Sequence, residues 1–294
     1  MIDNINFVSA FKKANIISII IFTLSVFFVF FKGLNYGIDF KGGTLIELRT
    51  DTSVQVSSIR ESLKSMNLGD VNVKRFGKEG DYLIKVEQKN TNNSNIILKI
   101  KKTLTNSLNS ELDFRRVENV GPKVSSELLE SSIIAISLAL AAMLFYIWVR
   151  FEWQFSVGSI IALFHDVVIT LGIFSLLSLE INLSIIAAVL TIVGYSMNDT
   201  VVIYDRIREN LLKYNKVNIS DISNLSINET LARTIITSVT TLLALISIYI
   251  LGGEILRGFS FAMILGVLIG TYSSIFVASP ILKLLKVSYK TLEK

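Results

Sequence analysis

Six long apolar stretches divide the chain, and shorter polar segments separate them. The hydrocarbon core of a bilayer is about 30 Å thick, and a helix of roughly 20 apolar residues can cross it. Six stretches are therefore predicted as transmembrane helices: residues 14–31, 129–149, 156–178, 183–203, 230–251 and 259–281. The first stretch is longer than the apolar region of about 7–15 residues in a signal peptide and lacks a small-residue cleavage motif, so we expect a retained anchor.

The segment 32–128, between the first two stretches, alternates between strand-like and helix-like periodicity. Strands are expected at 43–50, 71–76, 81–87 and 114–120, with helices at 54–67 and 93–109. The residues at helical spacing are Val56, Ile59 and Leu63 in the first helix, and Ile97, Ile100, Lys101 and Leu104 in the second. The order βαββαβ predicts an α+β, ferredoxin-like domain with both helices on one face of an antiparallel sheet.

The composition agrees with a polytopic membrane protein. The chain of 294 residues is 51% hydrophobic with only 18% charged residues, and its mean hydropathy is +0.56. It has no Cys and a single His, which excludes a disulfide framework, a Cys-based metal site and a multi-His metal cluster. We therefore expect neither a metal nor a cofactor. The net charge of +5 would suggest nucleic acid in a soluble protein, but here the placement of the basic residues matters more.

Basic residues in the short loops predict the orientation, because cytosolic loops are enriched in Lys and Arg. One side of the predicted bundle carries Lys12, Lys13, Arg150, Arg206, Arg208, Lys213, Lys216, Lys283, Lys286 and Lys290. The turns on the other side carry only Arg257. Both termini (1–13 and 282–294) and the loop 204–229 are thus expected in the cytosol, and the segment 32–128 in the periplasm. The basic surface of that segment is either a solvated face or a docking surface for an extended polypeptide or a partner domain.

The stretch GIDFKGGT, residues 37–44, resembles a phosphate-binding P-loop but lacks its lysine, because Gly43 occupies that position. It also follows a membrane span rather than a strand, and it is expected on the side where ATP is absent. A metal loop on Asp39 is equally unsuitable, since Ca²⁺ takes about six to eight oxygen ligands. We therefore predict a hinge between membrane and domain, formed by Gly37, Asp39, Gly42 and Gly43.

Four ionisable residues fall inside predicted spans, where charge is costly and usually functional. They are His165 and Asp166 in the third span, Asp199 in the fourth and Arg233 in the fifth. From a rise of about 1.5 Å per residue, Asp199 and Arg233 lie at a similar depth. They belong to polar helix faces formed by Thr191, Tyr195, Asn198 and Asp199, and by Arg233, Thr237, Thr240 and Thr241.

Two interpretations fit these charges. One is a static ion pair between Asp199 and Arg233 that fixes helix register. The other is a proton-coupling site of Asp199, Arg233, Asn198 and Thr237, in which protonation of Asp199 drives movement. Asp166 and His165 are further candidates, although the histidine could simply hydrogen-bond a neighbouring helix.

Glycines in the spans predict close helix packing. Gly266 and Gly270 form a G-x-x-x-G motif in the sixth span, and Gly194 lies in the fourth. Small residues at this spacing let helix backbones approach one another in a membrane.

Several stretches together resemble the SecF family of bacterial protein translocase subunits. They are YGIDFKGGT, VGPKVSSEL, ALFHDVVITLGI, VGYSMNDTVVIYDRIREN, RTIITSVTTL and GFSFAMILGVLIGTYSSIFVAS, in the expected order. The resemblance implies half of a transporter of the RND superfamily, paired with SecD in the inner membrane. It further implies use of the proton-motive force to assist preprotein export through SecYEG after the SecA ATPase has begun it. Asp199 and Arg233 match the positions that the family treats as its proton-coupling pair.

Two other functional classes share some of these sequence features. An RND-type exporter of small molecules or lipids would share the spans and charges, but it usually has two large external domains per half and an aromatic-lined pocket. An intramembrane aspartyl protease using Asp166 and Asp199 would need carboxylates about 3 Å apart, whereas these are expected roughly 10 Å apart in depth. We therefore expect a translocase subunit without hydrolytic chemistry, in contact with a SecD-like subunit, SecYEG, the preprotein and lipid, and not with nucleic acid.

Overall fold

The computed structural model describes residues 5–50, 54–64, 66, 68, 71–87, 94–108, 111–214 and 217–292. The chain forms two compact units. The helical unit contains the residues up to Asn35 together with Ala135–Leu179 and Ser184 onward. The second unit contains Tyr36–Ile134 and the short segment Glu180–Leu183.

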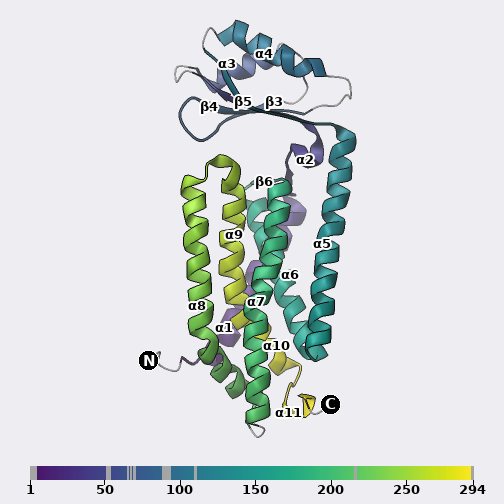
Figure 1. Cartoon of the computed structure of the whole chain (residues 1–294), viewed down its shortest axis with the longest axis vertical. Coiled ribbons are helices and arrows are strands. Elements are labelled where there is room, and N and C mark those ends of the chain that lie inside the picture. Colours follow the sequence, from purple (N-terminus) through teal and green to yellow (C-terminus); the bar gives the residue numbers. More distant parts are fainter. Residues whose placement is uncertain are drawn as a thin grey trace. The chain divides into compact units, whose positions relative to one another are not determined.

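The helical unit contains the six predicted apolar helices as long, roughly parallel rods (Figure 1). They are α1 (Val8–Phe31), α5 (Pro122–Arg150), α6 (Trp153–Leu176), α7 (Leu183–Lys213), α8 (Ile219–Leu251) and α9 (Glu254–Ser273). The last continues through a π-helical turn, η1 (Ser274–Ala278), into α10 (Ser279–Leu284), and α11 (Tyr289–Leu292) follows. Each of the six is long and apolar enough to cross a membrane, as predicted.

Several helices extend beyond the predicted spans. Most of the segment 204–229, predicted as a loop, is helical, because α7 continues to Lys213 and α8 begins at Ile219. Asn218 caps α8 by accepting a hydrogen bond from the Asp221 backbone N–H at 3.0 Å, which satisfies one of the free donors at a helix start. Polar residues can extend a helix once it has left the hydrocarbon, so hydropathy locates the span but not the ends of the helix.

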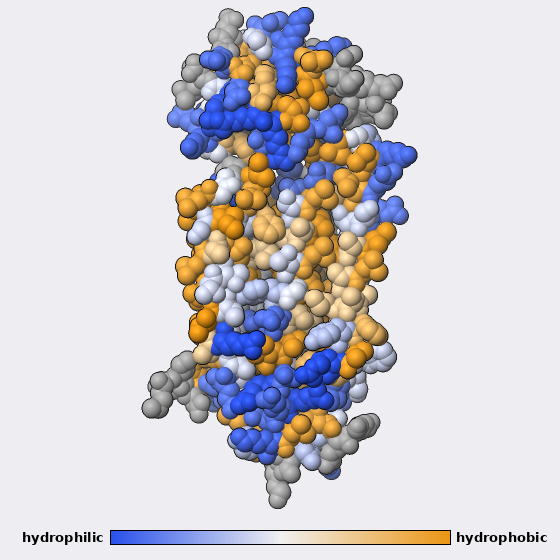
Figure 2. All heavy atoms as spheres, in the orientation of Figure 1, coloured by the Kyte–Doolittle hydropathy of each residue, from blue (hydrophilic) through white to orange (hydrophobic). Residues whose placement is uncertain are grey.

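The six long helices divide into an inner and an outer set. About half of the most apolar part of α6, α7 and the α9–α10 helix is buried, whereas α1, α5 and α8 expose most of theirs. Their exposed side chains are large and apolar, as at Phe30, Trp148 and Leu251, and the space-filling view shows apolar surface along the helices (Figure 2). Such surfaces suit lipid or partner helices and not water.

One end of the bundle is held by an aromatic cluster. The rings of Phe155 and Tyr204 meet edge to face with centroids 5.2 Å apart, and Phe151 packs against both. The Tyr204 hydroxyl donates to the carbonyl of Ala278 at 2.9 Å. Gly158 makes room for this hydroxyl, because a Cβ there would lie 2.1 Å from it. This close approach connects α6, α7 and the π-helical turn.

The second unit is a small α+β domain whose elements follow the predicted order βαββαβ. They are β2 (Gly43–Arg49), α3 (Val56–Lys64), β3 (Val71–Arg75), β4 (Asp81–Val86), α4 (Ser94–Leu108) and β5 (Asp113–Val120). The four strands form an antiparallel sheet in the order β3-β4-β2-β5, with α3 and α4 packed on it. The core contains Ile59, Leu63, Ile100 and Leu104, as the helical periodicity predicts.

The glycine stretch forms a single helical turn, α2 (Ile38–Lys41), before β2. Gly42 and Gly43 follow with φ of +77° and +136°, where side chains other than glycine are strained. The preceding β1 (Asn35–Tyr36) pairs with β6 (Glu180–Ile181) in a two-stranded sheet. Two of the predicted hinge residues, Gly42 and Gly43, therefore adopt conformations that favour glycine, while the predicted hinge motion stays a prediction.

Candidate functional site

Asp199 lies on the inner face of α7 and is only 3% exposed. Its Oδ2 atom has no hydrogen-bond partner among the described residues. Arg233, the residue predicted to pair with Asp199, lies on α8. However, among the described residues no carboxylate lies within salt-bridge distance of Arg233, whose side chain is exposed. The two groups predicted to pair therefore form no ion pair in the described part of the chain.

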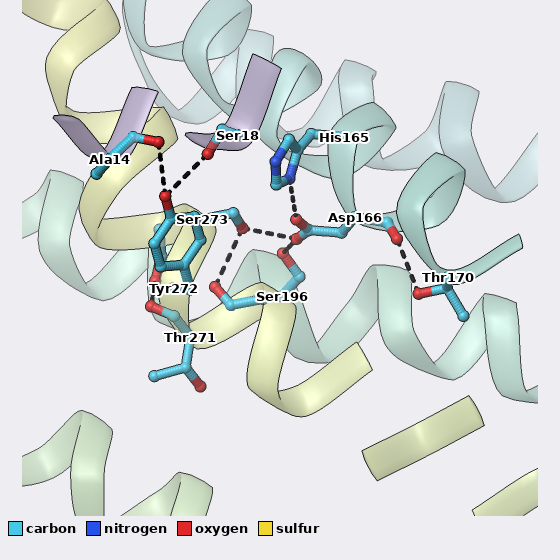
Figure 3. Close-up of polar contacts among 11 residues, drawn as sticks. Ala14, Ser18, His165, Asp166, Thr170, Ser196, Thr271, Tyr272 and Ser273 are labelled. Atoms are coloured by element: carbon cyan, nitrogen blue, oxygen red, sulfur yellow. Dashed lines mark hydrogen bonds and ion pairs between the residues drawn. The ribbon is translucent and has the colours of Figure 1, made fainter. Parts of the chain in front are cut away.

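Asp166 is the second buried carboxylate, and it is fully enclosed (Figure 3). Its Oδ2 accepts hydrogen bonds from Ser196 at 2.5 Å and from Ser273 at 2.7 Å. Its Oδ1 lies 2.8 Å from Nδ1 of His165. These partners come from α6, α7 and α9, so Asp166 joins the three inner helices at one point.

His165 completes the enclosure of Asp166. Its ring is 6% exposed and lies parallel to the ring of Phe22 on α1, at an interplanar angle of 6° and a centroid distance of 6.4 Å. With Nδ1 directed at Asp166, its Nε2 has no partner among the residues that the structure describes. The geometry places His165 between the carboxylate and the outer helix α1.

The two carboxylates therefore differ in their surroundings. Asp166 has both oxygens engaged by neighbouring side chains, which suits a fixed structural junction. Asp199 has a buried oxygen that no described protein group engages, so this oxygen remains free to take a proton. Of the two, Asp199 is the better candidate for a group whose charge changes during function.

The remaining predicted coupling residues are Asn198 and Thr237. Asn198 is exposed next to Asp199. The Thr237 hydroxyl donates within its own helix, to the carbonyls of Arg233 and Thr234, each at 3.0 Å. Neither residue contacts the Asp199 carboxylate through a hydrogen bond in the described part of the chain.

A different face of α8 points inward, and the sequence pattern did not predict it. Its buried polar residues are Ser223, Ser226, Thr230, Thr234 and Ser238. Ser238 joins three helices, because its hydroxyl lies 2.7 Å from that of Thr271 on α9 and accepts from Tyr195 on α7 at 3.4 Å. The spacing of these Ser and Thr residues, three and four positions apart, was visible in the sequence. Because apolar residues lie between them on the other sides of the helix, the sequence did not indicate which side of α8 is buried.

The predicted packing glycines have unequal environments. A Cβ at Gly266 would lie 2.2 Å from the Ile192 side chain, and one at Gly270 would lie 3.0 Å from Ser196 Cβ, so α9 and α7 approach closely there. At Gly194 the nearest atom is Met143 Cε at 3.9 Å, an ordinary contact that does not require glycine. The expected packing role of Gly194 therefore has no steric basis. The close approach of Gly172 to Ser25 was not predicted.

The predicted hinge residues contact the segment Glu180–Leu183 of the same unit. Asp39 accepts a hydrogen bond from the Leu183 backbone N–H at 2.9 Å. Gly37 donates its N–H to the Ile181 carbonyl at 2.8 Å, and a Cβ there would lie 2.6 Å from Glu180 Oε1. Glu180 also forms an ion pair with Lys85 of β4. Asp39 thus binds a backbone group, a role that its charge alone did not indicate.

The described residues contain no group of three or more potential metal ligands of the His, Cys, Asp or Glu type. The buried polar side chains among the described residues are the carboxylates of Asp166 and Asp199, the His165 imidazole, the Asn210 amide and several hydroxyls. This set can accept, hold and pass protons, and it can change helix packing when a charge appears or disappears.

Comparison with known proteins identifies the chain's relatives. Residues 99–288 match the SecD/SecF C-terminal family of protein export membrane proteins, and residues 27–54 match the SecD/SecF GG motif. The protein translocase subunit SecF of Rickettsia bellii is 48% identical over 92% of this chain and 90% of its own length. That of Cereibacter sphaeroides is 45% identical over 85% of this chain and 79% of its own.

Solved structures agree with this relationship. The crystal structure of SecDF from Thermus thermophilus, described as a translocon-associated membrane protein, has a TM-score of 0.87 and 36% sequence identity. The match covers 96% of this chain but 38% of the SecDF chain, so this chain corresponds to about two fifths of that protein. The matched regions include the glycine stretch, the apolar helices and both buried carboxylates. The chain therefore belongs to the SecF branch of the SecD/SecF family of protein export membrane proteins.

Proposed function

We propose that this protein is a proton-coupled subunit of the protein export machinery of the inner membrane. It pairs with a SecD-like subunit, and together they use the proton-motive force to assist preprotein movement through SecYEG. Both termini lie in the cytosol and the α+β domain in the periplasm, as the distribution of Lys and Arg predicts. The chain corresponds to only part of SecDF, which supports the need for a partner that supplies the rest.

The observation that carries the proposal is the state of Asp199. It is buried at 3% exposure, one of its oxygens has no described partner, and it forms no salt bridge with Arg233 in the described part of the chain. A static ion pair would place the two charged groups in direct contact with good hydrogen-bond geometry. An open pair with a free oxygen instead suits a carboxylate that gains and loses a proton.

The energy available is sufficient for such a mechanism. A proton that crosses 100 mV supplies about 2.3 kcal/mol, which shifts a balanced two-state equilibrium by about 50-fold. Protonation of Asp199 removes its attraction to Arg233, and deprotonation restores it. The packing of α7 against α8 therefore differs between the two charge states, and this difference can be transmitted to the external domain through α7 and the segment Glu180–Leu183 that precedes it.

The experiment compares export with and without a proton gradient in vesicles that contain this chain and its SecD-like partner. Asp199→Asn mimics the protonated state permanently, and Arg233→Met removes the opposing charge. We expect both variants to assemble with the partner but to lose the export stimulation that depends on the gradient. Gradient-dependent stimulation that persists in a well-assembled Asp199→Asn complex would show that Asp199 is not the coupling group.

A static ion pair predicts a different result. Each single variant would then lose stability and assembly, and the exchange Asp199→Arg with Arg233→Asp would restore both. Co-purification of the SecD-like partner, measured before export, therefore separates the two interpretations.

A further inference from the structure

The inner face of α8 carries a row of buried hydroxyl groups. Its members, Ser223, Ser226, Thr230, Thr234 and Ser238, are at most 8% exposed. Buried polar groups are unfavourable unless they form hydrogen bonds. A continuous row of them along one helix therefore needs partners along its whole length.

Contacts between α7 and α8 show which residue of the hydroxyl row lies opposite Asp199. Tyr195 of α7 forms a hydrogen bond with Ser238 at one end of the row, and Asn210 of α7 forms one with Ser226 near its other end. The two helices run in opposite directions, so Asp199, one turn after Tyr195, lies level with Thr234, one turn before Ser238.

Asp199 and Thr234 share an unusual property at this level. Both are buried, at 3% and 1% exposure, and both have a side-chain oxygen without a hydrogen-bond partner among the described residues. Buried polar groups without protein partners are typically satisfied by ordered water. Two such oxygens on facing helices therefore indicate a water-binding position between them.

The spacing of the hydroxyls allows one water molecule to lie between consecutive side chains of the row. Thr234, Thr230 and Ser226 are four residues apart, which corresponds to about 6 Å along the helix. This distance is too long for a direct hydrogen bond, but one water with two bonds of about 2.8 Å spans it. Thr230 donates to the Ser226 carbonyl at 2.9 Å, which leaves the lone pairs of its hydroxyl free to accept.

The row ends at a carboxylate near the surface. Asn210 donates to the Ser226 hydroxyl at 3.0 Å and to Glu229 at 2.6 Å. The Glu229 side chain is 33% exposed, and it also accepts from Arg206 at 2.7 Å. A half-exposed carboxylate at this position can exchange protons with the aqueous phase.

We propose that the hydroxyl row of α8 conducts protons between Asp199 and Glu229, with Thr234 as the first relay. This inference rests on the proposed coupling role of Asp199 and adds the route by which its proton reaches Glu229. Asp199 releases its proton to the adjacent water, and this water protonates the Thr234 hydroxyl, which passes its own proton onward. A water beside Ser226 passes the proton to Glu229, which releases it to the cytosol, while the Asn210 amide holds both oxygens in place and carries no proton itself. Each cycle therefore moves one proton, and no bond other than O–H changes.

The test measures proton flux in vesicles that contain the full chain and its SecD-like partner. Thr234→Val removes the hydroxyl and keeps the side-chain shape, while Thr234→Ser keeps the hydroxyl. Thr23→Val is the matched control, because Thr23 is an exposed threonine on α1. We expect Thr234→Val to fall to the flux of Asp199→Asn, and the serine and control variants to keep the original flux.

The outcomes separate this path from the proposed function. If Asp199→Asn abolishes flux but Thr234→Val keeps it, the path is wrong and the coupling role of Asp199 stands. If Thr234→Ser loses as much flux as Thr234→Val, Thr234 acts by packing and the path is again wrong. If Asp199→Asn keeps its flux, the proposed function itself fails.

A second variant tests the far end of the row and does not depend on how the bundle tolerates valine. Glu229→Gln keeps the shape of the side chain and its bond from Asn210. We expect it to slow the flux and to change its dependence on cytosolic pH, because the exchanging carboxyl is lost. Unchanged flux and an unchanged pH profile would overturn the proposed exit.

Discussion

Asp166 and Asp199 are the same residue type in neighbouring inner helices, yet the structure gives them different environments. Asp166 receives hydrogen bonds from Ser196 and Ser273 and contacts His165, so its carboxyl group is held in one place. Asp199 has an oxygen that no described group engages. Three neighbouring side chains thus fix the Asp166 carboxylate, whereas one oxygen of Asp199 is available to another partner.

Gly43 supports a prediction at the same scale. Its φ is +136°, and a Cβ there would lie 2.5 Å from the Val86 carbonyl oxygen, which belongs to the backbone of β4. We expect Gly43→Ala to cost about 1–3 kcal/mol of local stability through backbone strain alone. Faster hydrogen exchange of the β2 and β4 amides in the full-length protein would measure this loss.

Gly121 provides the control for that experiment. It lies outside the positive-φ glycines, and no atom lies within 4 Å of an added Cβ. Gly121→Ala should therefore leave amide exchange in the sheet unchanged. Equal protection in both variants would mean that Gly43 is not needed for the turn into β2.

The two faces of α8 differ in their exposure and in their contacts with other helices. The face predicted from the sequence, with Arg233 and Thr237, is largely exposed within the described chain. The inner face contains the hydroxyl row and contacts α7 and α9 through Ser238. An exposed polar face within a membrane span suits water or a partner helix better than lipid.

The contact between α7 and α9 yields a prediction about packing. A Cβ at Gly266 would lie 2.2 Å from Ile192, which is itself 1% exposed. Gly266→Ala should therefore destabilise the bundle by about 1–3 kcal/mol, because the extra methyl cannot be placed without moving Ile192. Thermal unfolding in detergent measures the effect.

Two further variants make this test specific. In the double variant Gly266→Ala, Ile192→Ala the alanine methyl occupies the space that Ile192 leaves, so the combined loss should be smaller than the sum of the single losses. Gly194→Ala, where the nearest atom is 3.9 Å away, should be neutral or slightly stabilising because alanine favours helix. Additive losses in the double variant would contradict the steric explanation.

For the whole molecule, the orientation in the membrane is open to direct measurement. The chain has no Cys, so single cysteines can be introduced without removing others. Ser126 precedes the apolar part of α5, Ser288 follows α10, and both are exposed. We expect a membrane-impermeant thiol reagent to label Ser126→Cys in intact spheroplasts, and Ser288→Cys only after the membrane is permeabilised. The reverse labelling pattern would overturn the predicted orientation.

Features that depend on local periodicity and composition could be predicted from the sequence. Six apolar stretches of sufficient length had to become helices, because an unpaired backbone is too costly in hydrocarbon. The alternation between Gly43 and Val120 predicted the strand and helix order of the small domain. Asp199 and Arg233 stood out because charges are rare in such spans, and the motifs around them indicated the family.

Which of these groups come into contact depends on the tertiary structure. The partners of Asp166 are Ser196 and Ser273, on helices 30 and 107 residues further along the chain, and no local pattern links them. The same is true of the buried face of α8, because a helix with apolar residues on all sides does not reveal which side faces its neighbours. Helix rotation and register are set by close packing at positions such as Gly266 and Ile192, and these long-range contacts exist only once the bundle has formed.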